Sequence, residues 1–170
     1  MLVQYLMIAI IDKLINKISI ILMVMMFLMP IITSILILTR SIFGIGSISV
    51  QELVMYFHAT IFMLGIAYTL KHNRHVSIDI FYNSFSTKTK KRIIKLGYLI
   101  FIIPFGVFLI YISSGMVFES WRLLEGSSEA GGLGYVFILK SLIPLCGVLI
   151  VLQSFVILTK EFKGKVEDDC

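Results

Sequence analysis

Residues 51–79 read QELVMYFHATIFMLGIAYTLKHNRHVSID. The stretch opens with Glu52, crosses 18 residues, Leu53–Leu70, without an Asp, Glu, Lys or Arg, and ends in a polar segment that contains His75 and Asp79. A helix rises about 1.5 Å per residue and a hydrocarbon core is roughly 30 Å thick, so a run of this length suits one membrane crossing. The stretch therefore predicts a transmembrane helix with polar residues marking both of its ends.

The rest of the chain has the same apolar character. Of its 170 residues, 58% are hydrophobic and only 15% are charged, whereas a soluble domain is closer to half apolar and a quarter charged. Three more charge-free runs occur, at 18–39, 96–118 and 141–159. Such runs must be helical, because lipid offers no partner for backbone N–H and C=O groups. The sequence predicts an all-α integral membrane protein, one domain over residues 1–170, with four transmembrane helices at about 18–39, 53–71, 95–118 and 135–159.

Positive charge is distributed unevenly among the segments between the predicted spans. Twelve Lys and Arg residues fall in the N-terminal lead-in, the loop between the second and third spans, and the C-terminal tail, whereas the other two loops hold only Arg40 and Arg122. Cytoplasmic loops carry an excess of Lys and Arg, so both termini are predicted to be cytoplasmic. Residues 1–17 lack a basic leader and a small-residue cleavage site, and are predicted to be a retained lead-in. Because the bases cluster between apolar spans, nucleic-acid binding is not predicted.

The loop between the second and third spans has an amphipathic pattern. Its apolar residues at helical spacing are Ile78, Phe81, Tyr82 and Phe85. A basic cluster, 88–92, follows them. This pattern predicts a short amphipathic helix over about 77–91 that lies along the cytoplasmic membrane surface. The alternative is that the basic cluster simply anchors the third span.

Polar residues in and beside the second span are the first candidates for chemistry. His75 and Asp79 stand four apart, so on a helix the carboxylate can orient the imidazole. Two ligands are too few for a metal site, and a structural clamp is favoured over a metal site or a proton relay. His58 lies inside the span, where a polar residue indicates function, and a contact with a neighbouring helix or subunit is favoured over haem ligation, for which no second histidine lies in a span. The helix dipole accounts for Glu52, because it favours an acid near a helix N-terminus.

A second group of residues is suited to contacts with another protein. Gly65 and Ala67 allow close approach of a helix, and Trp121 suits the membrane–water interface. The outer-loop charges either pair locally or meet a soluble partner. Burying the charge of Lys140 in lipid costs free energy unless the side chain reaches the membrane–water interface or pairs with another group of the protein. The candidate partner-facing residues are His58, Ala67, Trp121, Arg122, Glu125, Glu129 and Lys140.

Motifs for catalysis or cofactor binding are not found in the sequence. Cys146 lies in an apolar run and Cys170 is the last residue, so both are predicted to be free thiols without a disulfide, zinc or redox role. There is no nucleophile elbow, phosphate loop or zinc motif. A transport site normally needs polar groups or broken helices at the membrane midplane, and these spans are smoothly apolar. The sequence therefore predicts an accessory protein that packs against a larger membrane protein. We expect it to have no enzymatic activity, cofactor or metal.

The residues of the second span and of the loop before the fourth span resemble those of a known family, the small membrane subunit of tripartite ATP-independent periplasmic (TRAP) transporters. The sharp part of the resemblance is an acid at the start of the second span, a glycine later in it and a His-Val-x-x-Asp motif after it: Glu52, Tyr56, Gly65, His75, Val76 and Asp79. A later stretch is also similar: Glu119-Ser120-Trp121, Glu125, Ser127-Ser128, Gly131-Gly132-Leu133 and Lys140-Ser141. Gln51 departs from the pattern, because some members carry two consecutive acids there.

The resemblance implies a place in a larger assembly. It implies a bacterial inner-membrane protein that packs, among membrane lipids, against a large multi-span subunit, and that this large subunit holds the substrate and sodium sites. A periplasmic binding protein would deliver an organic acid, and a sodium gradient would drive uptake without ATP. The small subunit would widen the fixed scaffold of the large one. Two alternatives are an autonomous small membrane transporter and a membrane redox or quinone protein.

Overall fold

The structure is a computed structural model that describes residues 2–72 and 86–162. Its helices are α1 (Leu2–Phe43), α2 (Ile48–Lys71), α4 (Thr87–Gly97), the π-helical segment η1 (Tyr98–Ile102), α5 (Ile103–Arg122) and α6 (Val136–Phe162). Within these two described ranges there is no strand. Four helical stretches are long and apolar enough to cross a membrane: Ile8–Phe43, Ile48–Lys71, Arg92–Arg122 and Val136–Thr159. The predicted all-α membrane fold with four spans is therefore confirmed.

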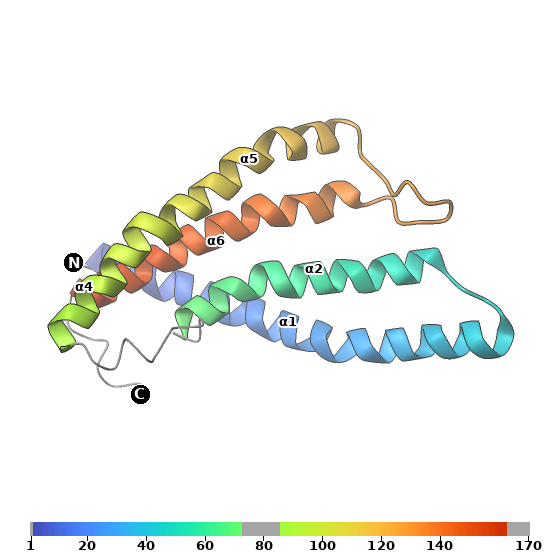
Figure 1. The fold of residues 1–170 in the computed structure, drawn as a ribbon, viewed down its shortest axis with the longest axis horizontal. Helices are drawn as coiled ribbons and strands as arrows, with labels where there is room; N and C mark the ends of the chain where they lie inside the picture. Colours follow the sequence, from blue (N-terminus) through green and yellow to red (C-terminus); the bar gives the residue numbers. More distant parts are fainter. Residues whose placement is uncertain (1, 73–85, 163–170) are drawn as a thin grey trace.

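The helices form two antiparallel pairs, α1 with α2 and α5 with α6 (Figure 1). The connections 44–47 and 123–135 lie at one end of the molecule, which we call the loop end. The start of α1 and the end of α6 lie at the opposite end, which we call the terminal end. The first connection is short because Gly44 adopts a left-handed conformation with a φ of 68° directly after α1, a common way for a helix to stop.

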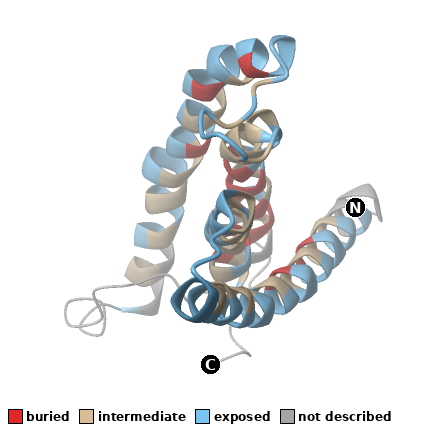
Figure 2. Ribbon diagram, turned by 90° about the vertical axis from the view of Figure 1, so that its right-hand side faces the viewer, coloured by how far each residue is buried: buried red, intermediate tan, exposed pale blue. Residues whose placement is uncertain are grey.

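Helix α6 is the centre of the packing. In the most apolar part of each span, 39% of the residues are buried in α6, against 6% in the first and third spans and 11% in the second. One cluster joins Leu70 of α2 to Cys146 and Ile150 of α6, and a second joins Ala67 of α2 to Leu149. Figure 2 shows that buried residues are concentrated on this helix, while the other helices are mainly exposed or intermediate.

Two glycines allow α5 and α6 to pack closely. A Cβ atom at Gly147 would lie 2.6 Å from the carbonyl oxygen of Gly106 and 2.9 Å from Cγ1 of Ile110. A Cβ atom at Gly106 would lie 2.8 Å from Cγ2 of Val151. Small residues let membrane helices bring their backbones together and gain van der Waals contact. The α5–α6 contact therefore depends on this pair.

Helix α4 continues through η1 into α5 without a break. Gly97, Tyr98, Ile102 and Ile103 all have right-handed helical dihedral angles. The widened η1 turn ends at Ile102, two residues before Pro104, and a proline removes a backbone hydrogen bond and crowds the preceding helical turn. Most of the predicted surface helix, residues 77–91, lies outside the described residues. Its final part, from Thr87, belongs to α4 and so to the same continuous helix as the third span.

At the terminal end, an ion pair and two hydrogen bonds join α1 to α2. Lys71, the last residue of α2, places its Nζ 3.1 Å from the backbone oxygen of Asp12, 2.6 Å from Oδ1 of Asn16 and 3.7 Å from a carboxylate oxygen of Asp12. The Lys71 side chain is only 14% exposed. The predicted lead-in is thus helical, continuous with the first span and joined to the second by polar contacts.

Candidate functional site at the loop end

The connection 123–135 folds into a closed turn before α6 begins. The backbone N–H of Ser127 donates to the carbonyl of Leu133 at 2.9 Å, and that of Gly132 donates to the carbonyl of Glu129 at 3.0 Å. The Ser127 hydroxyl also accepts from the backbone N–H of Glu129 at 3.1 Å. Gly131 has a φ of 83°, a left-handed backbone conformation that few residue types other than glycine adopt. We call residues 127–133 the outer turn.

Glu52 of α2 anchors the outer turn. Its Oε2 atom accepts a hydrogen bond from the backbone N–H of Leu133 at 2.6 Å, and its Oε1 atom accepts one from the hydroxyl of Ser127. Ser49, one turn earlier in α2, donates its hydroxyl hydrogen bond to the carbonyl of Gly131. A Cβ atom at Gly132 would lie 2.8 Å from Oε1 of Glu52. Glycine at this position therefore lets the turn close over the carboxylate.

These contacts revise the interpretation of Glu52. The helix dipole was sufficient to explain an acid near the start of the second span, but α2 begins at Ile48 and Glu52 is its fifth residue. Its partners lie 75 and 81 residues away in the sequence. Hydrogen bonds to a charged group are stronger than those between neutral groups. Glu52 is therefore a tertiary anchor for the outer turn.

A second polar cluster joins the end of α5 to the start of α6. Lys140 places its Nζ 2.5 Å from Oε2 of Glu125, and the buried Ser120 donates its hydroxyl to the same carboxylate at 2.6 Å. The hydrogen bond from Lys140, followed by that from Ser120, lowers the pKa of Glu125 below its usual range. The predicted need of Lys140 for a partner is thus met within the chain. Arg122 pairs with Glu119 at 3.6 Å, and both side chains are exposed.

Trp121 completes the link between α5 and α6. Its indole N–H donates to the hydroxyl of Ser141 at 2.7 Å, and its ring meets Phe137 edge-on with centroids 4.8 Å apart. Ser141 in turn donates to the carbonyl of Phe137 at 2.7 Å. Trp121, Glu125 and Lys140, which were predicted to face a partner, therefore form contacts inside the chain. Trp121 also remains 49% exposed.

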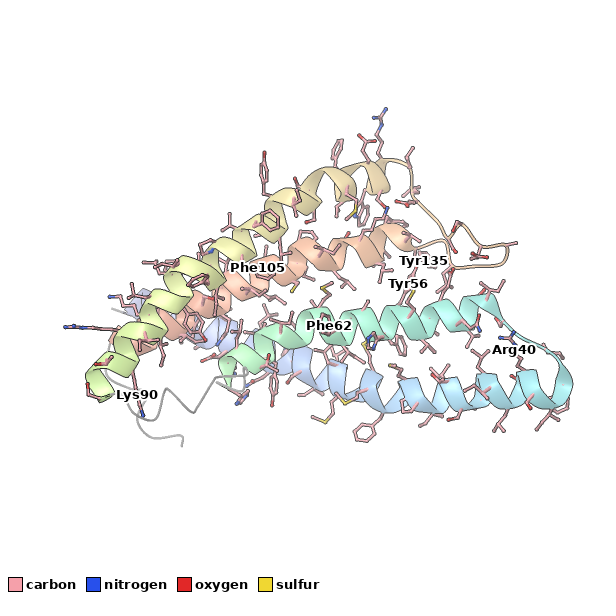
Figure 3. All side chains as sticks on the ribbon, in the orientation of Figure 1. Arg40, Tyr56, Phe62, Lys90, Phe105 and Tyr135 are labelled. Carbon is pink, nitrogen blue, oxygen red and sulfur yellow. The ribbon has the colours of Figure 1, made fainter. Side chains whose placement is uncertain are left out.

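Tyr56 follows Glu52 by one turn of α2, and its side chain projects toward α6 (Figure 3). Its hydroxyl is buried and has no hydrogen-bond partner in the part of the chain that the structure describes. The loop end therefore combines a fixed turn, two anchored carboxylates and a buried tyrosine hydroxyl. Glu129, in the outer turn, is exposed.

The other predicted residues have different surroundings. His58 is exposed, and a Cβ atom added at Gly65 would have no neighbour within 4 Å, so both lie on an open face of α2. Ala67 is only 2% exposed and packs with Ile15 and Leu149 of the same chain. The residues of the predicted clamp, His75, Val76 and Asp79, lie outside the described residues.

Sequence reasoning missed the residues that hold the outer turn. Ser49, Ser127 and Gly132 sit in polar or glycine-containing segments, and the sequence indicated a tight turn there without indicating what it folds against. No group of three or more metal-binding side chains occurs in ranges 2–72 and 86–162. Instead, the carboxylates of Glu52 and Glu125 at the loop end bond to hydroxyl, ammonium and backbone N–H groups of the chain.

This architecture defines a four-span membrane protein that carries a fixed polar turn at one end. The family model of the DctQ component of tripartite ATP-independent periplasmic transporters matches residues 29–164. The chain therefore belongs to this family of transporter components, and the resemblance found in the sequence is confirmed. The match includes the three later spans, the last third of α1 and the whole outer turn. No curated protein matches the chain.

Proposed function

We propose that this chain is the accessory and scaffold subunit of a sodium-coupled, binding-protein-dependent importer of organic acids. In this proposal it packs against a large multi-span subunit that holds the substrate and sodium sites, and it carries out no catalysis itself. The family supports the role of a transporter component. The substrate class, the sodium coupling and the packing partner are inferred from the general design of such transporters.

One observation carries the scaffold role. The chain's own residues cover only a small part of the first three spans, while Glu52, Glu125 and Lys140 at the loop end are bonded within the chain. Membrane helices associate through packing and interhelical hydrogen bonds. A set of helices with a fixed loop end and largely uncovered apolar sides is suited to join a larger membrane protein as a rigid unit.

The proposed orientation places the terminal end in the cytoplasm and the loop end in the periplasm. The excess of Lys and Arg in the lead-in, the central loop and the tail supports this direction. The outer turn would then face the space in which a periplasmic binding protein delivers its substrate. The exposed side chains of Arg122 and Glu129 are available at this surface.

The test is reconstitution with the neighbour-encoded large subunit and binding protein. A tagged form of this chain should copurify the large subunit from mild detergent. In vesicles, uptake of the organic acid should require both membrane subunits, the binding protein and an inward sodium gradient. Uptake at full rate without this chain would contradict the proposal, and so would a large subunit that never copurifies with it.

A further inference from the structure

The open face of α2 carries a polar residue at membrane depth. His58 lies near the middle of the 24-residue helix Ile48–Lys71, and its side chain is exposed. Lipid cannot hydrogen-bond an imidazole, so polar residues at this depth normally face protein or a water-filled cavity. Among the described residues, the other charged or imidazole side chains of the spans lie toward the helix ends. The surface around His58 is therefore poorly suited to contact with lipid.

The residues that follow His58 along α2 border an apolar groove. Phe62 and Gly65 follow His58 at intervals of four and three residues, so the three lie along one face of α2. A groove of about 580 Å³ runs between α1 and α2 beside Phe62 and Gly65, and Leu22 and Met26 line its other side. Because the position of a Gly65 Cβ is open, a neighbouring backbone can approach closely there. The methionine can adapt its shape to an incoming side chain.

The outer face of α5 provides a contrast. Its exposed residues near the middle of the span include Phe105, Phe108 and Ile112, which are 53%, 55% and 60% exposed. Acyl chains can cover these three side chains without leaving a polar group unsatisfied, and Tyr111, which is 78% exposed, is the neighbouring residue of α5 that carries one. The surroundings of Phe105 therefore differ from those of Phe62, since Phe62 lies one helical turn from an imidazole that needs a hydrogen-bonding partner.

We propose that His58, Phe62 and Gly65, with the adjoining α1–α2 groove, form the surface on which a helix of the large transport subunit docks. That helix presents a hydrogen-bonding side chain or a free backbone carbonyl to His58 and places its apolar face against Phe62. This inference rests on the proposed function, because it takes the large subunit as the partner. Polar complementarity at His58 is the reason for choosing a protein helix over lipid.

Site-specific photocrosslinking tests the surface. Phe62 is replaced by p-benzoylphenylalanine in the full chain, which is co-expressed with the large subunit, irradiated and purified by its tag. Phe105 on α5 is the matched control, because it is also an exposed phenylalanine within a span (Figure 3). The expected result is a covalent adduct with the large subunit from position 62 and none from position 105. An adduct from 105 alone, an adduct between two copies of this chain, or no protein adduct from 62 would overturn the inference.

A second pair of variants tests the histidine. His58→Gln keeps a donor and an acceptor, whereas His58→Leu removes both. Because one interhelical hydrogen bond is worth about 1 kcal/mol in a membrane, His58→Leu should lower the yield of copurified large subunit about three- to ten-fold, and His58→Gln should retain most of it. Equal yields from both variants would overturn the role of His58. Loss of copurification for the unmodified chain would overturn the proposed function itself, whereas a complex without the position-62 adduct would overturn only this surface.

Discussion

The close contact between α5 and α6 makes a quantitative prediction about Gly147. In the variant Gly147→Ala, the new methyl group would lie 2.6 Å from the backbone oxygen of Gly106, which cannot rotate away, and 2.9 Å from Cγ1 of Ile110. The helices must separate by several tenths of an ångström to remove this clash. Overpacking of this kind typically costs about 1–3 kcal/mol. Alanine in place of glycine also favours a helix by about 0.5–1 kcal/mol.

Gly115→Ala is the matched control for this experiment. Gly115 lies in α5, and a Cβ atom there would have no neighbour within 4 Å. Both variants gain the same helix propensity, so the difference between their free energies of unfolding equals the overpacking cost, about 1–3 kcal/mol. Gly115→Ala should be as stable as the parent or slightly more stable, and Gly147→Ala should be less stable than Gly115→Ala.

The assay can follow the chain's single tryptophan. Trp121 bonds to Ser141 and packs against Phe137, so its fluorescence reports separation of α5 from α6. The purified chain in mild detergent is titrated with sodium dodecyl sulfate, and the unfolding midpoints are compared. If Gly147→Ala unfolds at the same midpoint as Gly115→Ala, then α5 and α6 do not depend on this close approach, and the packing argument is refuted.

The remaining predictions concern the polar contacts at the two ends. Glu52→Gln should speed hydrogen exchange at the backbone N–H of Leu133, because that amide loses a charged acceptor at 2.6 Å; the exposed Glu129→Gln is the control, and unchanged exchange would contradict the anchor. The lowered pKa of Glu125 means that its carboxylate stabilises the fold above the ordinary glutamate pKa of about 4.3, and that this stability is lost as pH falls through the lowered value. Unfolding midpoints between pH 7 and pH 3 should therefore fall less in Glu125→Gln than in the parent, and parallel curves would refute this. Lys71→Met should destabilise the chain by about 1–3 kcal/mol in the same unfolding assay, because it removes two hydrogen bonds from a charged donor and an ion pair between α1 and α2; no change would contradict the proposed link.

Much of the fold follows from properties that are local in the sequence. Charge-free runs of about 20 residues predict spans because the bilayer imposes both the helical conformation and its length. The motif around Glu52 and Gly65 identified the family, because it combines particular residue types with a particular place in the topology. The sequence also predicted that Lys140 requires a partner or the interface, since this follows from the cost of a charge in lipid.

The pairing of the polar residues could not be predicted in the same way. The interval between Glu52 and its partners is 75 and 81 residues, and no periodic pattern relates positions on separate helices. Ala67 illustrates the same limit, because a small residue on a membrane helix suits a partner and the chain's own core equally well. The structure places it against Ile15 and Leu149 of the same chain.

The sequence by itself therefore determined that this protein has four apolar helices and to which family it belongs. Hydrophobic length and local motif are properties of single segments, and they do not depend on how the segments meet. The tertiary structure alone decided that Glu52 holds the outer turn, that Gly106 and Gly147 bring α5 and α6 together, and that His58 faces outward. Each of these depends on how helices are rotated and placed beside one another, and that arrangement results from the packing of the whole chain.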